Sequence, residues 1–135
     1  ELSRKSGLSK RYWFYGACYE EAVIGEMYYN ATACISPGNV GLTAIHSLMY
    51  GCPVITHSDF SKQMPEFEAI RVGSTGDFFE YGNAGSLAET IEAWLKGHYP
   101  KNEALRNDCF RIIDEKFNPY YQIKVLNSQL LTLNS

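Results

Sequence analysis

The sequence lacks the excess of basic residues that domains binding nucleic acid usually carry. Its 12 Lys and Arg residues are outnumbered by 15 Asp and Glu residues, so the formal net charge is −3. Binding to nucleic acid or to an anionic membrane normally shows as a basic stripe on one face. The amino end does carry Arg4, Lys5, Lys10 and Arg11. We interpret this cluster as a solvated lead-in rather than a contact with lipid head groups, and we expect no nucleic-acid partner.

The sequence also lacks long apolar runs and clustered metal ligands. No run approaches the roughly 18 to 20 residues that span a bilayer, and the first residues do not form a signal peptide. The four cysteines stand far apart, without CxxC or His-rich spacing: Cys18, Cys34, Cys52 and Cys109. This spacing predicts neither a zinc site nor a disulfide framework. We expect a cytoplasmic protein that is not transmembrane and that uses neither a metal nor a cofactor.

A charge-free segment occupies residues 27–58, where no Asp, Glu, Lys or Arg occurs although charged residues make up 20% of the chain. Such a segment belongs at the centre of a fold. Residues that break helices divide it into short pieces: Pro37, Gly38, Gly41, Gly51 and Pro53. These breaks exclude one long membrane helix and favour buried parallel strands around a short helix.

The hydrophobic pattern of residues 12–56 alternates between strands and helices. We predict strands at 12–15, 33–36 and 53–56, and helices at 20–30 and 43–50. This order predicts an α/β fold: a Rossmann-like parallel sheet with helices on both faces and right-handed crossovers. The chain begins with Glu1, close to the first predicted strand. We therefore expect the domain to be truncated at its N-terminal side.

Three more helices are predicted after a polar loop at 57–63 and a glycine-punctuated stretch at 73–85. The capping box from Ser86 to Glu89 opens the first, Asn102 caps the second, and Pro119 suits the first turn of the third. Their apolar residues are Leu87, Ile91 and Leu95, then Leu105, Cys109, Ile112 and Ile113, then Tyr120, Ile123, Leu126, Leu130 and Leu131. The chain thus divides into a lead-in at 1–11, a strand and helix core at 12–85, and C-terminal helices at 86–135.

A candidate phosphate-binding loop joins the strand at 33–36 to the helix at 43–50. Its residues are Pro37, Gly38, Asn39, Val40, Gly41 and Leu42. A helix N-terminus leaves backbone N–H groups unpaired and carries partial positive charge, so it binds a diphosphate where glycine lets the backbone approach. Ligands of open parallel sheets also settle at the carboxyl ends of the strands. The alternative is a glycine turn that merely links strand to helix.

Several motifs, taken in order, resemble the carboxyl-terminal domain of the family 4 (group 1) glycosyltransferases. They are Gly41-Leu42, Gly51-Cys52-Pro53-Val54-Ile55, Pro65-Glu66, Gly73-Ser74-Thr75-Gly76 and the ending Glu115-Lys116-Phe117. The likeness extends over about residues 13–117. Those enzymes have the GT-B fold, in which two Rossmann-like domains face each other and the second mainly holds the donor nucleotide. The resemblance implies that this chain is the C-terminal half of a GT-B fold.

The resemblance also implies a function, that of the donor-binding part of a retaining glycosyltransferase. Such an enzyme transfers a sugar from a nucleoside-diphosphate sugar to a glycan or a lipid-linked acceptor, at the inner membrane face through the full-length protein. It generally needs no metal. The missing N-terminal acceptor-binding domain would be a partner, so we expect the fragment to be inactive alone.

The family resemblance places further residues near the donor. Glu66 matches a glutamate in a loop beside it. The base pocket would lie near the residues that follow the first predicted strand, which are Gly16, Ala17, Cys18 and Tyr19. Tyr19 either stacks on the base or fills a gap at the rim.

The sequence departs from the family at two acidic positions, which contact the donor sugar and the ribose and which fall here at Gly38 and His46. We place His46 one turn into its helix, where the dipole disfavours the imidazolium, so that a neutral imidazole can hydrogen-bond a ribose hydroxyl. The alternative is a histidine satisfied by a neighbouring backbone group. Asn39 or a backbone amide is expected to replace the acid at Gly38. No catalytic residue is assigned.

Two other functions suit the same architecture. One is an epimerase that acts on the nucleotide-sugar with His46 as its acid or base, and the other is a non-catalytic, flavodoxin-like binding module. An epimerase needs further titratable residues around the sugar, and the charge-free segment offers few. A flavodoxin-like module predicts an acidic cluster at the strand ends, which Asp59 alone does not provide.

Overall fold

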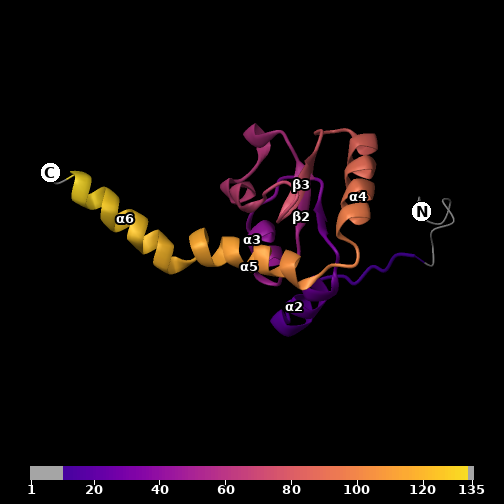
Figure 1. Ribbon diagram of the computed structural model, residues 1–135, viewed down its shortest axis with the longest axis horizontal. Coiled ribbons are helices and arrows are strands. Elements are labelled where there is room, and N and C mark those ends of the chain that lie inside the picture. Colours follow the sequence, from indigo (N-terminus) through magenta and orange to yellow (C-terminus); the bar gives the residue numbers. More distant parts are fainter. Residues whose placement is uncertain (1–10, 134–135) are drawn as a thin grey trace.

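Residues 11–133 are described by the computed structural model, which shows an α/β fold around a three-stranded parallel sheet (Figure 1). The strands are β1 (Cys34–Ser36), β2 (Val54–His57) and β3 (Gly76–Phe79), in the order β1-β2-β3. Cys34 lies opposite Val54, and Val54 lies opposite Gly76. β2 is therefore the central strand, and each of its residues is buried.

Helices cover both faces of this sheet. They are α2 (Glu21–Asn30), α3 (Leu42–Met49), α4 (Ala84–His98), α5 (Glu103–Lys116) and α6 (Pro119–Leu133), with the short 3₁₀ helices η1 (Phe60–Lys62) and η2 (Pro65–Ala69). Figure 1 shows α4 on one side of the strands and α3 and α5 on the other. The predicted α/β fold with a parallel sheet is confirmed.

The central strand β2 supplies side chains to two separate cores, because successive residues of a strand point to opposite faces. Val54 packs in the first core with residues of α3 and α5, namely Ala44, Leu48, Cys109 and Ile112. Ile55 packs in the second core with Phe79, Trp94 and Leu105. The charge-free segment thus contains β1, α3 and β2. Of these, β2 is central and wholly buried, whereas β1 is an edge strand whose Ile35 is 38% exposed.

The prediction of a strand at 12–15 is wrong. These residues form an irregular segment, in which the side chains of Trp13 and Phe14 are 75% and 83% exposed. The aromatic rings contact one another instead, with Trp13 and Tyr15 centroids 4.8 Å apart. Strand formation requires a neighbouring strand to accept its backbone hydrogen bonds. In the described part of the chain β1 is the edge of the sheet and no such pairing forms.

A strand that the pattern did not predict, β3, lies within the glycine-punctuated stretch at 73–85. Its first residue, Gly76, pairs with Val54, and a Cβ atom on Gly76 would lie 1.8 Å from the Val54 carbonyl oxygen. Glycine is therefore present because two strands approach each other closely. The glycines of this stretch obscure the hydrophobic pattern that is typical of a strand.

The start and the buried face of α4 differ from the prediction. Asn83, rather than Ser86, is the N-cap, and its side chain accepts a hydrogen bond from the Ser86 amide. The Ser86 hydroxyl accepts instead from the Glu80 amide at 3.0 Å. Trp94 is the buried residue of this helix, whereas Leu95 is 42% exposed. Leu87 and Ile91 are partly buried against the second core, as predicted.

The last two helices begin where the sequence predicts. The Asn102 side chain accepts a hydrogen bond from the Leu105 amide at the start of α5, and Pro119 is the first residue of α6. Within α5, Leu105, Cys109 and Ile112 are buried. Figure 1 shows α6 extending away from the sheet. Its apolar side chains are exposed: Tyr120, Ile123, Leu126, Leu130 and Leu131. No helix within residues 11–133 is both long and apolar enough to cross a membrane.

Candidate functional site

The loop at 37–41 lies at the carboxyl end of β1 and leads directly into α3. Pro37, Gly38 and Asn39 are exposed, whereas Val40 is fully buried in the first core. The Thr56 hydroxyl, on the neighbouring strand β2, donates to the Ser36 carbonyl at 2.8 Å. The structure therefore places the predicted loop at the sheet edge where ligands of parallel sheets bind, with its tip open to solvent.

Gln63, which no sequence motif singles out, contacts this loop. The Val40 amide donates to Gln63 Oε1 at 2.6 Å. The Gln63 side-chain amide donates in turn to Thr56 Oγ1 at 3.0 Å and to the His57 carbonyl at 2.9 Å. One side chain thus joins the loop to the end of β2. A polar residue in the segment that follows a central strand was the only sequence signal for it.

His46 lies one turn after Leu42 in the 8-residue helix α3, as predicted, and it also belongs to the last turn of this short helix. The helix ends early because Gly51 adopts a left-handed conformation, with φ of +68°. The Cys52 amide then donates to the Ser47 carbonyl and the Gly51 amide to the Leu48 carbonyl, which closes the helix in a Schellman motif. His46 therefore lies within about one turn of both ends of this short helix.

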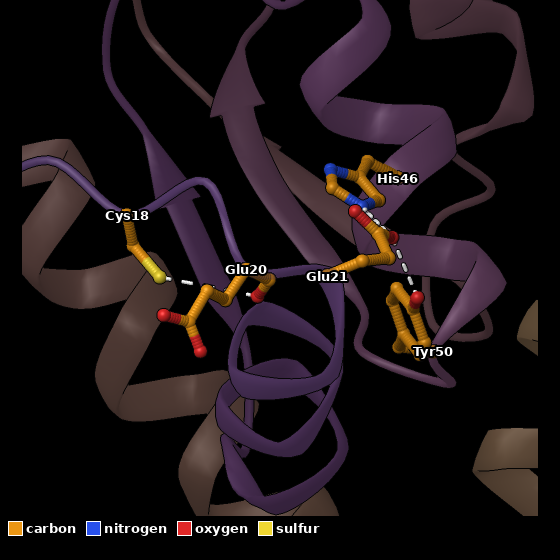
Figure 2. A network of polar contacts seen from close by, with 5 residues as sticks. All are labelled: Cys18, Glu20, Glu21, His46 and Tyr50. Atoms are coloured by element: carbon orange, nitrogen blue, oxygen red, sulfur yellow. Dashed lines mark hydrogen bonds and ion pairs between the residues drawn. The ribbon is translucent and has the colours of Figure 1, made fainter.

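The partner of His46 is a carboxylate rather than a backbone group. Its Nε2 lies 2.7 Å from Glu21 Oε1, at the start of α2, and the Tyr50 hydroxyl donates to the same oxygen at 2.6 Å (Figure 2). The second ring nitrogen of His46 lies on the side away from Glu21 (Figure 2). The ring of Tyr28 lies beside those of His46 and Tyr50, with centroids 5.6 and 6.5 Å away.

The Glu21 carboxylate is the acceptor that His46 and Tyr50 share. The hydrogen bond from Tyr50, and then that from His46, lower the pKa of the Glu21 carboxyl below its usual value of 4.5. The same contact raises the pKa of the Tyr50 hydroxyl. Glu21 is therefore ionised near neutral pH and accepts from both neighbours, which requires that Nε2 of His46 carry a hydrogen. In the neutral ring the other nitrogen, Nδ1, is then an acceptor.

A cleft of about 460 Å³ lies beside His46. Its lining includes Gly16, Cys18, Tyr28, Cys34 and His46. Three residues predicted near the donor, Gly16, Cys18 and His46, therefore meet in one place. Burial raises the pKa of the Cys34 thiol, so this cysteine is a neutral apolar wall rather than a nucleophile.

Ala17 and Tyr19 are not among the residues that line this cleft. The Tyr19 side chain is 92% exposed. The segment at 16–19 also does not follow a strand, contrary to expectation, because residues 12–15 form none. Its approach to His46 comes from the way the irregular chain leads into α2, where Cys18 Sγ contacts the Glu20 carbonyl at 3.9 Å (Figure 2).

Glu66 lies in the first turn of η2, beside the start of α3. It lines a second cleft, of about 410 Å³, together with Leu42, Ile45 and Phe117. Its Oε2 atom is buried and has no hydrogen-bond partner within the described residues. The structure therefore brings Glu66 together with Leu42 at the helix N-terminus, while Gly16, Cys18 and His46 line the other cleft.

Neither a group of metal ligands within the described residues nor a related protein constrains the function of this site further. Within residues 11–133 no three His, Cys, Asp or Glu side chains are grouped so that they could hold a metal ion. A scan against protein-family models and searches of curated proteins and of solved structures gave no match.

Proposed function

We propose that this chain is the donor-binding part of a retaining glycosyltransferase with a GT-B fold. The enzyme would transfer a sugar from a nucleoside-diphosphate sugar to a glycan or a lipid-linked acceptor. One observation carries the proposal: the glycine loop at 37–41 lies at the carboxyl end of β1 in a parallel sheet and opens α3. This is the position in which such folds bind phosphate.

The loop and the start of α3 would stabilise the leaving diphosphate. The first amides of an α-helix have no carbonyl one turn back to pair with, and together they carry partial positive charge. Dipoles that are fixed before the reaction stabilise charge that develops on a leaving group. The exposed Gly38 and Asn39 leave the loop backbone open to an oxygen of the ligand.

His46 and the cleft beside it would hold the nucleoside. His46 lies four residues after Leu42, which is about 6 Å along the helix axis. Its Nδ1 faces away from Glu21 and is available to a ribose hydroxyl. The base would occupy the cleft lined by Gly16, Cys18 and Tyr28, and Tyr28 offers an aromatic ring.

The Glu21–His46 pair also favours one alternative, an epimerase that acts on the nucleotide-sugar. An epimerase requires titratable residues around the sugar, and Glu21 brings a carboxylate to His46 from outside the charge-free segment. The two functions differ in their products. An epimerase converts the nucleotide-sugar alone, whereas a transferase releases nucleoside diphosphate only when an acceptor is present.

Ligand-observed NMR with the 135-residue chain tests the proposal. UDP, GDP, ADP and CDP are titrated in parallel, with the corresponding nucleosides as controls that lack phosphate. At least one diphosphate is expected to bind, weakly because the acceptor-binding domain is not part of this chain. Failure of all four to bind would overturn the transferase and the epimerase together.

A loop variant adds a test of the phosphate contact. A Cβ at Gly41 would meet Met64 side-chain atoms at 3.5 Å, an ordinary contact, so Gly41→Val is expected to fold and to cover the loop amides. Gly97→Val is the matched control, because a Cβ at Gly97 meets nothing within 4 Å. Unchanged affinity in a folded Gly41→Val variant would count against the loop.

A further inference from the structure

We propose that Gln63 determines which ligands the loop at 37–41 accepts, because its side chain occupies the Val40 amide in the free protein. A phosphate oxygen must replace Gln63 Oε1 there before the ligand can bind. This inference rests on the proposed function, since it assigns a role to a residue at the same site.

The Gln63 side chain is fixed by three hydrogen bonds to buried groups. Its Oε1 accepts from the Val40 amide at 2.6 Å, and its Nε2 donates to Thr56 Oγ1 and to the His57 carbonyl. Val40, Thr56 and His57 are all fully buried. Buried polar groups require a partner, and Gln63 supplies one to each of these three. It therefore fills a position that would otherwise need a ligand or water.

The hydrogen bond from Val40 sets the competition. A backbone amide has one hydrogen, so the Val40 amide cannot donate to a phosphate while it donates to Gln63. The Gln63 oxygen is a neutral acceptor. A phosphate oxygen is charged, and hydrogen bonds to a charged acceptor are roughly twice as strong as those between neutral groups. An anionic ligand therefore competes with Gln63 for the Val40 amide better than a neutral sugar or nucleoside does.

The displaced side chain has room to leave. Gln63 is only partly buried, and it directly follows η1. When it leaves, the Thr56 hydroxyl keeps its bond to the Ser36 carbonyl. The Met64 amide holds the same segment to the Val40 carbonyl at 3.3 Å. Binding is thus expected to move the side chain of Gln63 while the backbone of the segment stays attached.

Two variants test this exchange with pyrophosphate and with the nucleoside diphosphates as probes. Gln63→Leu has a similar size but accepts no hydrogen bond, so it frees the Val40 amide. Affinity is expected to rise about three- to tenfold, the effect of one net hydrogen bond. Gln63→Glu offers a charged oxygen to Val40 and repels the anion, so affinity is expected to fall. Gln129→Leu, on α6, is the matched control and should leave affinity unchanged.

The outcomes separate this inference from the proposed function. If the native chain binds a diphosphate and Gln63→Leu binds it no better, the proposed displacement of Gln63 is wrong and the proposed function stands. If only Gln63→Leu binds, both are supported. If no variant binds any probe, both are overturned. Hydrogen exchange of the Val40 amide gives a readout without ligand. This amide should exchange faster with solvent in Gln63→Leu, and an unchanged rate would contradict its hydrogen bond to Gln63.

Discussion

His46 Nε2 lies 2.7 Å from Glu21 Oε1, and this contact joins the end of α3 to the start of α2. The same carboxylate oxygen accepts from the Tyr50 hydroxyl. Glu21 therefore holds two side chains that belong to the end of one short helix. It supplies the negative charge that the charge-free segment around His46 lacks.

Replacing Tyr50 by Phe is expected to raise the pKa of Glu21. The hydrogen bond from Tyr50 is the largest of the contacts that lower this pKa, and the phenylalanine ring keeps the packing. The carboxyl ¹³C chemical shift of Glu21, followed by NMR against pH, measures the change. Tyr28→Phe is the control, because the Glu21 pKa does not depend on that hydroxyl. An unchanged midpoint in Tyr50→Phe would refute the assignment.

This pKa shift has a definite effect on stability. A carboxyl whose pKa is lower in the folded protein stabilises the fold at pH values above its usual pKa. That contribution is lost as the pH falls through the folded pKa. The difference in stability between the native chain and Tyr50→Phe is therefore expected to shrink in acid, and denaturant titrations at pH 7 and near pH 3 measure it.

Gly25→Ala is expected to loosen the packing of α2 on α3. A Cβ at Gly25 would lie 2.6 Å from the Tyr50 ring, which Glu21 and Tyr28 hold in place. We expect a loss of about 1–3 kcal/mol in the free energy of unfolding, although alanine favours helix. In a Tyr50→Ala background the same substitution should be neutral or stabilising. A loss of equal size in both backgrounds would show that the ring is not the obstacle.

Gly76→Ala is expected to disrupt the pairing of β2 with β3. The new Cβ would lie 1.8 Å from the Val54 carbonyl oxygen, a backbone atom that cannot move aside alone. We expect a loss of at least about 3 kcal/mol in the free energy of unfolding, measured by denaturant titration. Gly97→Ala, in an exposed turn of α4, should instead stabilise by up to about 1 kcal/mol. Equal effects at the two positions would contradict the strand pairing.

Trp94 and Leu95 are neighbours on α4 that should differ sharply on truncation. Trp94 is 2% exposed and stacks on His98, whereas Leu95 is 42% exposed. Trp94→Ala is expected to destabilise by about 3–5 kcal/mol, and Leu95→Ala by less than about 1 kcal/mol. Thermal or denaturant unfolding measures both. A larger loss for Leu95→Ala than for Trp94→Ala would mean that α4 buries Leu95, as the sequence pattern predicts.

Local patterns predicted most helices because the signals that start and stop a helix are local. Asn102 lies three residues before the Leu105 amide that it caps, and Pro119 is itself the first residue of α6. α4 shows the limit of this reasoning. Ser86 and Glu89 match a capping box, but the preceding Asn83 takes the capping position. Which side of α4 is buried was decided by the sheet, since Trp94 packs with Ile55 and Phe79.

Strands were predicted less well because pairing between strands is not local. The aromatic run at 12–15 has the composition of a strand but pairs with no strand within residues 11–133, whereas Gly76 lies in a glycine-punctuated stretch and pairs with Val54. The candidate site behaves in the same way. Its loop could be placed from the sequence, but Glu21 and Gln63 could not, because each reaches it from a separate part of the chain.

The sequence by itself indicated that the charge-free segment at 27–58 contains the central part of the fold, because an uncharged segment broken by glycine and proline favours burial in short pieces. The structure confirms this for β2 and for the inner face of α3, whereas none of residues 27–39 is buried. The sequence also determined the alternation of strands and helices that gives a parallel sheet. Only the tertiary structure decided which polar groups meet. Hydrogen bonds such as Val40 to Gln63 and His46 to Glu21 act over about 3 Å, and residues 23 and 25 positions apart come that close only when the chain is folded.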